Sequence, residues 1–235
     1  MLPASTGILT QLQREVLAAA FARVDLAKSF GLSAGTALHE FYAGARRSED
    51  LGLFTPTPDL VRPFGRALAS ELPKALPGLR VEVLRDFGTF TTLLATREDG
   101  TVRMDIGAAD PPVMGPIREV EGTHVFDLAD IAAGKAHSIA DRREPRDAFD
   151  LWVIVTKLGY SMEAIEALLF EKDHGLRDYP PAWIAGLRNL ADSSDLLPTD
   201  LQSMLLVPAN EGELRAFLYG AADGAVERAR RRLPE

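Results

Sequence analysis

The feature that most constrains the fold is a change of hydrophobic pattern at about residues 110–125. Before it, three short runs of strand-forming residues follow one another, with turn residues between them. These runs are Arg80–Arg85, Phe90–Ala95 and Val102–Ile106. After His124 the apolar residues recur at helical spacing. The sequence therefore predicts an α+β fold with one mixed sheet, organised as an α+β domain over residues 1–120 and a helical domain over residues 121–235.

Further elements are expected around these strands. The helices predicted in the first half are Ser5–Phe30, Gly35–Ala43 and Asp59–Ala75. The segment from Gly31 to Ser33 is expected to link the first two helices, and Asp50–Phe54 to form a strand closed by a proline turn. The helices predicted in the second half are Asp127–Arg142, Pro145–Leu158, Met162–Asp173, Pro181–Ala191, Asp200–Met204 and Glu211–Arg232.

The composition is that of a globular protein with an acidic balance. Of the 235 residues, 46% are hydrophobic and 26% are charged, and the formal net charge is −8. A protein that only coats nucleic acid is usually basic overall, so contact with RNA would need local basic patches. The sequence offers two such patches: Arg142, Arg143 and Arg146 near the middle, and Arg228, Arg230, Arg231 and Arg232 at the end. The second patch has an alternative explanation, because cations are favoured at a helix C-terminus.

The sequence excludes several kinds of site. It contains no cysteine, which rules out disulfides, thiolate nucleophiles and Cys-bound zinc. The histidines, His39, His124, His137 and His174, show no metal-ligand spacing. No apolar run reaches the roughly 18 residues that a membrane helix needs. The N-terminus lacks the pattern of a signal peptide, so we expect a cytoplasmic location and no membrane partner.

The first candidate for chemistry is the small-residue run that precedes the second predicted helix. Gly35 allows close approach of the backbone, and the amides of a helix start favour a phosphate. The hydroxyls of Ser33 and Thr36 would add donors to that phosphate. The alternative is an ordinary helix start with Ser33 as its N-cap.

The second and third candidates are strand aspartates. Two aspartates at i and i+2 in a strand would face one magnesium site. Here Asp50 is followed at i+2 by Gly52, which offers no ligand, and Glu49 points to the other face. Asp105 lies between apolar residues, where a carboxylate could complete a metal site or act as a base. The alternatives are a strand-edge Asp50 without metal, and an Asp105 that faces water on an edge strand or pairs with Arg103.

The fourth candidate lies in the helical half. Lys135 occurs in an otherwise apolar, alanine-rich helix and could reach phosphate oxygens as a point charge. Asp147 and Asp150 are three residues apart and therefore close on a helix surface, just after Arg146. Because Asp147 falls in the first turn of a helix, where an acid is favoured, it also has a structural explanation.

Taken in order, these segments resemble the AbiEii/AbiGii family of nucleotidyltransferase toxins, which includes the MenT-type toxins. The resemblance runs from about residue 31 to 155. It rests on Gly35-Thr36-Ala37-Leu38, Arg46, Ser48, Asp50, Asp105, Lys135, Arg146, Asp147 and Asp150. Ala34 stands where the family often has a first glycine, and Gly52 stands where it has its second metal-binding aspartate.

The resemblance implies a nucleotidyltransferase-like mixed sheet with flanking helices. It also implies a magnesium ion, with manganese as the alternative, held by Asp50 and Asp105, and catalysis that involves these two aspartates and Lys135. The residues implied to bind nucleotide are Ser33, Gly35, Thr36, Arg46, Ser48, Lys135, Arg146, Asp147 and Asp150. The implied partners are a nucleoside triphosphate, a tRNA or protein acceptor, and an antitoxin protein.

Three hypotheses follow. In the first, the chain is a toxin of a toxin–antitoxin or phage-defence system that transfers a nucleotide from a nucleoside triphosphate to RNA, for example tRNA, or to a protein, with an atypical metal site. In the second, the same fold binds a nucleotide or a protein partner without catalysis, which the glycine at position 52 and the net charge of −8 favour. In the third, the chain is an unrelated α+β domain.

Overall fold

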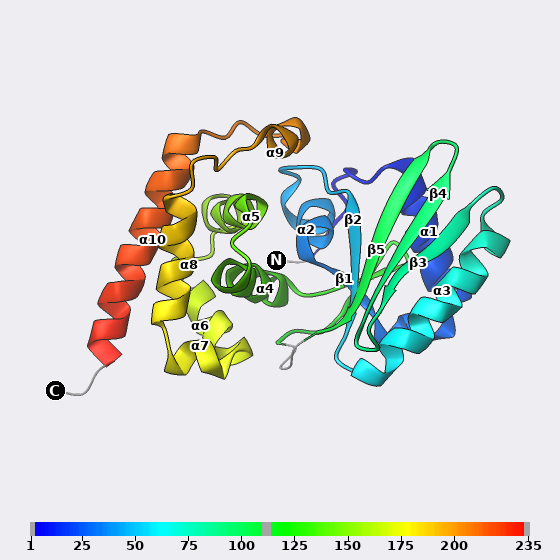
Figure 1. The fold of residues 1–235 in the computed structure, drawn as a ribbon, viewed down its shortest axis with the longest axis horizontal. Coiled ribbons are helices and arrows are strands. Elements are labelled where there is room, and N and C mark those ends of the chain that lie inside the picture. Colours follow the sequence, from blue (N-terminus) through cyan, green and yellow to red (C-terminus); the bar gives the residue numbers. More distant parts are fainter. Residues whose placement is uncertain (1–2, 110–113, 233–235) are drawn as a thin grey trace. The chain divides into compact units, whose positions relative to one another are not determined.

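The protein consists of two compact units, which we describe separately. The computed structural model describes residues 3–109 and 114–232. One unit runs to Leu128 and combines a sheet with helices, and the other begins at Ala129 and is helical (Figure 1). The expected fold class is therefore confirmed. The first unit continues past residue 120 because a strand that ends at Val125 belongs to its sheet.

The first unit contains short helices and strands in an irregular order. They are α1 (Gln11–Arg23), the 3-10 helix η1 (Asp25–Ser29), β1 (Gly31–Ser33), α2 (Ala34–Leu38), the π-helix η2 (His39–Ala43), β2 (Asp50–Thr55), the 3-10 helix η3 (Pro58–Leu60), α3 (Val61–Ala75), β3 (Arg80–Asp86), β4 (Phe90–Arg97), β5 (Gly100–Ala108), β6 (Arg118–Val120) and β7 (Thr123–Val125).

The first helix is shorter than the sequence predicted. It begins at Gln11 because Thr10 and Gln13 form a capping box, in which each side chain bonds to the backbone of the other residue. After Arg23 the chain continues as η1 rather than as an α-helix. The expected link from Gly31 to Ser33 is a strand, so that prediction is wrong.

Among the described residues, seven strands form one mixed sheet in the order β3-β4-β5-β2-β1-β7-β6. The strands β3, β4 and β5 are antiparallel neighbours, whereas β2 lies parallel to β5 and antiparallel to β1. This order places β2 and β5 in the interior of the sheet. Their side chains are therefore presented on two faces with no exposed strand edge beside them.

One face of the sheet carries the hydrophobic core of the first unit. Alternate residues of β2 and β5 point to this face and are fully buried, for example Leu53 and Ile106. The helices α1 and α3 cover it, as Figure 1 shows. Phe30 and Phe64 stack there with ring centroids 4.0 Å apart. Burying each such side chain contributes about 1.5–3 kcal/mol, so this face holds the unit together.

The surface of the first unit adds an ion cluster and an apolar area. Arg97 contacts Glu15 and Asp99, each at 2.7 Å, and this guanidinium lowers the pKa of both carboxyls.

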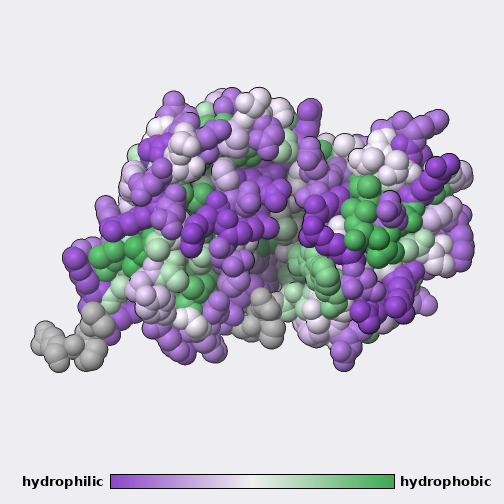
Figure 2. Space-filling view, in the orientation of Figure 1, coloured by the Kyte–Doolittle hydropathy of each residue, from purple (hydrophilic) through white to green (hydrophobic). Residues whose placement is uncertain are grey.

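Figure 2 shows hydrophobic residues gathered over the strand region of this unit. The exposed large hydrophobic side chains of β3 and the turn after it are Val83, Leu84 and Phe87.

The second unit is built from seven helices within the part of the chain that the structure describes. They are α4 (Leu128–Asp141), α5 (Pro145–Thr156), α6 (Met162–Lys172), α7 (His174–Asp178), α8 (Pro181–Ala191), α9 (Thr199–Met204) and α10 (Glu211–Arg232). The sequence predicted all of these except α7. A Cβ atom at Gly186 would lie 2.5 Å from the carbonyl oxygen of Ile139, so only glycine allows α8 to approach α4 this closely.

Candidate functional site

The turn that leads from β1 into α2 has an unusual backbone. Ala34 has a φ of 59°, in the left-handed region that favours glycine. This conformation explains why a glycine would be suitable at this position. Ser33 is the N-cap residue of α2, as the alternative expected, but its side chain makes no capping hydrogen bond. Ser33 and Ala34 are both partly exposed beside the buried Gly35.

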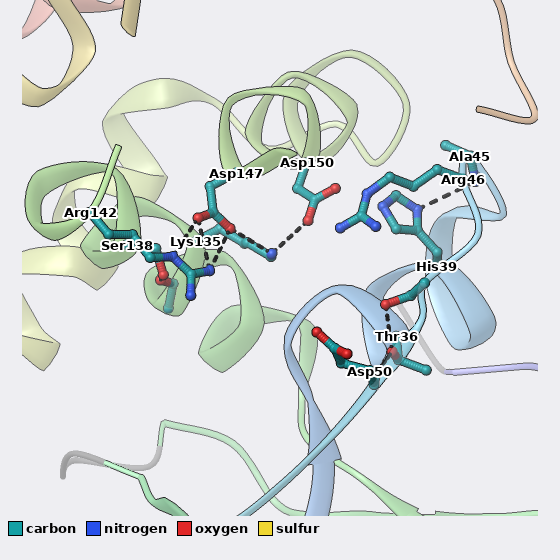
Figure 3. A network of polar contacts seen from close by, with 12 residues as sticks. Thr36, His39, Ala45, Arg46, Asp50, Lys135, Ser138, Arg142, Asp147 and Asp150 are labelled. Carbon is teal, nitrogen blue, oxygen red and sulfur yellow. Dashed lines mark hydrogen bonds and ion pairs between the residues drawn. The ribbon is translucent and has the colours of Figure 1, made fainter. Parts of the chain in front are cut away.

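The start of α2 is fastened to the strand β2 by hydroxyl groups. The buried Thr36 hydroxyl donates to the main-chain oxygen of Asp50, and it lies 2.7 Å from the Ser48 hydroxyl (Figure 3). The amide nitrogen of Gln13 donates to the carbonyl oxygens of Ser48 and Glu49, at 2.8 and 3.1 Å. These bonds fix the segment just before Asp50. Sequence reasoning missed Gln13, because a glutamine in a helix has no pattern that indicates such a role.

The second face of the sheet carries the candidate aspartates. In register, Asp50 lies opposite Arg103 and Gly52 lies opposite Asp105, and directly paired residues project on the same face. Asp50 and Asp105 are therefore diagonal neighbours, with Cα atoms about 8 Å apart for strands about 4.8 Å apart and a rise of about 3.3 Å per residue. The structure thus brings the two sequence-predicted aspartates together on one sheet face.

Asp105 is held by two neighbours on this face. Its Oδ1 accepts a hydrogen bond from the Thr92 hydroxyl at 2.8 Å and two from the Arg103 guanidinium, both at 3.2 Å. Its Oδ2 and the carboxylate of Asp50 have no partner within the described residues. Because β5 lies between β4 and β2, the idea of Asp105 on an edge strand is wrong, whereas its pairing with Arg103 is observed.

The space above Gly52 is filled by an aromatic ring. A Cβ atom at Gly52 would lie 2.9 Å from Cε2 of Phe54, and one at Gly107 would lie 3.0 Å from its Cε1. The Phe54 ring therefore lies across two glycines on neighbouring strands. The sequence showed that a carboxylate is missing at position 52, but not that a ring occupies the adjacent space.

These donors suit one magnesium ion better than two. Among the described residues there is no group of three or more His, Asp or Glu that could hold a metal. Magnesium in nucleotide sites is often bound by one or two carboxylates together with phosphate oxygens. Asp50 and the free oxygen of Asp105 supply that number. At Gly52 the chain offers no side-chain ligand for a second ion.

In the helical unit, a buried ion cluster joins α4 and α5. The ammonium group of Lys135 lies 2.8 Å from Asp147 and 2.6 Å from Asp150, and Arg142 bonds to both oxygens of Asp147 (Figure 3). Both aspartates are fully buried, and the Lys135 side chain is 5% exposed. These two cations and two anions balance in charge, and their contacts link the two helices.

The comparisons with known proteins decide the family. A family described as nucleotidyl transferase AbiEii toxin of a type IV toxin–antitoxin system matches residues 15–218. The chain belongs to this AbiEii family. A search of curated protein sequences gave no match.

Solved structures of similar fold include nucleotidyltransferase toxins. MenT4, a nucleotidyltransferase toxin from Mycobacterium tuberculosis H37Rv, has a TM-score of 0.67 and 17% identity, covering 92% of this chain and 82% of that one. JHP933 from Helicobacter pylori has a TM-score of 0.61 and 18% identity, covering 94% and 92% of the two chains. The AbiEii assignment identifies the chain as a member of a class of nucleotidyltransferase toxins, and the two solved structures share its fold.

The remaining residues expected from the AbiEii resemblance lie in different environments. Arg46 is 3% exposed and donates to the carbonyl oxygen of Arg47 at 2.9 Å, so it contributes to the local backbone. Arg146 is exposed in the first turn of α5. Nucleotide binding by these residues stays a prediction. Within residues 3–109 and 114–232, no helix is long and apolar enough to cross a membrane.

Proposed function

We propose that this AbiEii-family chain transfers a nucleotide from a nucleoside triphosphate to the hydroxyl of an RNA acceptor, with tRNA as the first candidate. The observation that supports this proposal is the pair of carboxylates, Asp50 and Asp105, on one sheet face beside the turn into α2. A magnesium or manganese ion, held by these carboxylates and by phosphate oxygens, would neutralise charge that develops on the phosphate. An antitoxin protein is the expected regulator.

The chain's own residues would act on the acceptor and on the triphosphate. The acceptor oxygen forms a bond to the α-phosphorus, the bond from that phosphorus to the bridging oxygen breaks, and pyrophosphate leaves. The proton of the acceptor hydroxyl goes to a solvent water, because Oδ2 of Asp105, the oxygen that has no partner among the described residues, is the one that would hold the metal. Thr92 and Arg103 fix the other oxygen and so orient this carboxylate.

The second candidate function is binding without catalysis. The Phe54 ring beside Gly52 and the Arg103 guanidinium on Asp105 favour it, because both reduce the capacity of this face for metal. A net charge of −8 also suits a protein partner better than bare RNA.

A labelling experiment tests the transfer. The protein is incubated with each labelled nucleoside triphosphate, Mg²⁺ or Mn²⁺, and total tRNA. We expect label on RNA with the wild type and a loss of at least about 100-fold with Asp50→Ala, since catalytic electrostatics of this kind are typically worth 10²–10³ in rate. The control is Asp59→Ala, an exposed aspartate in η3. Equal labelling by wild type and Asp50→Ala, or no labelling at all, would contradict catalysis at this site.

A further inference from the structure

The charge arrangement around Asp105 differs from what a site with two metal ions requires. Three carboxylates would give a charge of −3, against the +4 that two divalent cations carry. Here Gly52 removes one carboxylate, and Arg103 adds a positive charge between Asp50, its partner in register, and Asp105, to which it is bonded. The three side chains Asp50, Arg103 and Asp105 therefore sum to −1.

We propose that the guanidinium of Arg103 is a built-in cation that binds the triphosphate in place of a second divalent metal. This inference rests on the proposed function. Guanidinium groups recognise phosphate through paired N–H donors, and Arg103 presents such donors on the same face as the two aspartates. Its side chain is 43% exposed, so it can contact a ligand while it remains anchored through Asp105.

A second guanidinium, that of Arg85, lies on the same sheet face as Arg103. Arg85 of β3 lies opposite Thr92, and Thr92 lies opposite Asp105, so these three residues share one face. Arg85 is exposed and has no partner within the described part of the chain. Thr92 therefore lies between Arg85 and Asp105, and Arg103 lies in the neighbouring row, two residues before Asp105 along β5, where a chain of phosphates could contact both guanidinium groups.

The ring of Phe54 supports the same conclusion from geometry. It occupies the space beside Gly52, where a second ion and its carboxylate would have to be accommodated. Positive charge for the triphosphate must then come from elsewhere on this face, and Arg103 is the cation bonded to Asp105 there.

Binding measurements without metal test this role. ATP, GTP, CTP and UTP are titrated separately into the full chain by calorimetry, in EDTA and in Mg²⁺. We expect the wild type to bind at least one of them in EDTA with a dissociation constant within about threefold of that in Mg²⁺. Arg103→Gln should weaken binding in EDTA by at least about tenfold, the range of a hydrogen bond to a charged group, and should make binding depend on Mg²⁺.

Two further variants make the result specific. Arg103→Lys keeps the charge but loses the paired donors, so it should bind in EDTA with an affinity between those of wild type and Arg103→Gln. Arg14→Gln removes an exposed guanidinium from α1, on the covered face of the sheet, and should leave binding unchanged. Thermal unfolding of each variant shows whether it is folded.

The outcomes separate this inference from the proposed function. If the wild type binds nucleotides only with Mg²⁺, Arg103 is not a built-in cation, whereas the proposed transfer stands. If no nucleotide binds under either condition, both proposals are wrong. If Arg103→Gln and Arg14→Gln weaken binding equally, the effect is general charge and the role of Arg103 is refuted.

Discussion

Replacing Gly52 with alanine tests whether the Phe54 ring fills the space of the missing carboxylate. The added Cβ would lie 2.9 Å from Cε2 of the ring, closer than carbon atoms normally approach. Overpacking of this kind typically costs about 1–3 kcal/mol, and removing a glycine from a strand returns about 0.5–1 kcal/mol. We therefore expect Gly52→Ala to lower the free energy of unfolding by about 1–2 kcal/mol.

A double-mutant cycle measures the contact itself. Urea-induced unfolding followed by circular dichroism would compare Gly52→Ala, Phe54→Leu and the double variant with the wild type. With the smaller leucine side chain at position 54, the alanine should be neutral or stabilising, which gives a coupling energy of about 1–2 kcal/mol. The control Gly220→Ala adds the same atom in α10 where nothing lies within 4 Å, and should stabilise by about 0.5–1 kcal/mol. A neutral Gly52→Ala in the presence of Phe54 would refute the reasoning.

Three further predictions follow from local geometry. Because Ala34 has a φ of 59°, Ala34→Val should destabilise by about 1–2 kcal/mol in urea unfolding, whereas Ala34→Gly should stay within about 1 kcal/mol of wild type. Lys135→Met leaves the buried carboxylates of Asp147 and Asp150 without their shared cation, and should cost about 3–5 kcal/mol. Arg97 lowers the pKa of Glu15 and Asp99 in the folded state. The stability that these carboxylates contribute is therefore fully present above their ordinary pKa values of 4.5 and 3.8, and it is lost as the pH falls through the lowered values of the folded state. Arg97→Met should reduce this loss at acid pH when the free energy of unfolding is measured against pH.

The main elements could be predicted from the sequence because each is long enough to show a periodic pattern of apolar side chains. The strands β2 to β5 and the helices α8 and α10 fall where alternation and helical spacing placed them. The strands β1, β6 and β7 have three residues each, too few for a period, and all three were missed. The segment Gly31–Ser33 forms β1, whereas the sequence predicts a link there because Gly31 favours a helix stop.

The residues of the candidate site could be predicted from the sequence, but the contacts between them could not. Alternation along β2 showed that Asp50 and Gly52 share a face, but the register that places Asp105 opposite Gly52 depends on pairing between distant strands. The sequence predicts that Lys135 could reach phosphate oxygens as a point charge. The structure pairs it with two buried carboxylates of α5, a contact that no spacing within α4 could reveal.

Gly52, the Phe54 ring and Arg103 act together at this site, and this determines what a substitution that restores the carboxylate would need. If the chain had lost only the metal ligand at position 52, the space beside Gly52 would be empty and the charge of Asp105 would have no cation beside it. Here the Phe54 ring fills the space beside Gly52, and Arg103 partly balances the charge of Asp105. In the Gly52→Asp variant the new side chain would therefore clash with the Phe54 ring, and a metal that it bound would compete with the Arg103 guanidinium for Asp105. Only when Phe54 is also made smaller would a third carboxylate have room opposite Asp105, and direct Mn²⁺ titration should then show tighter binding for Gly52→Asp with Phe54→Leu than for Gly52→Asp by itself.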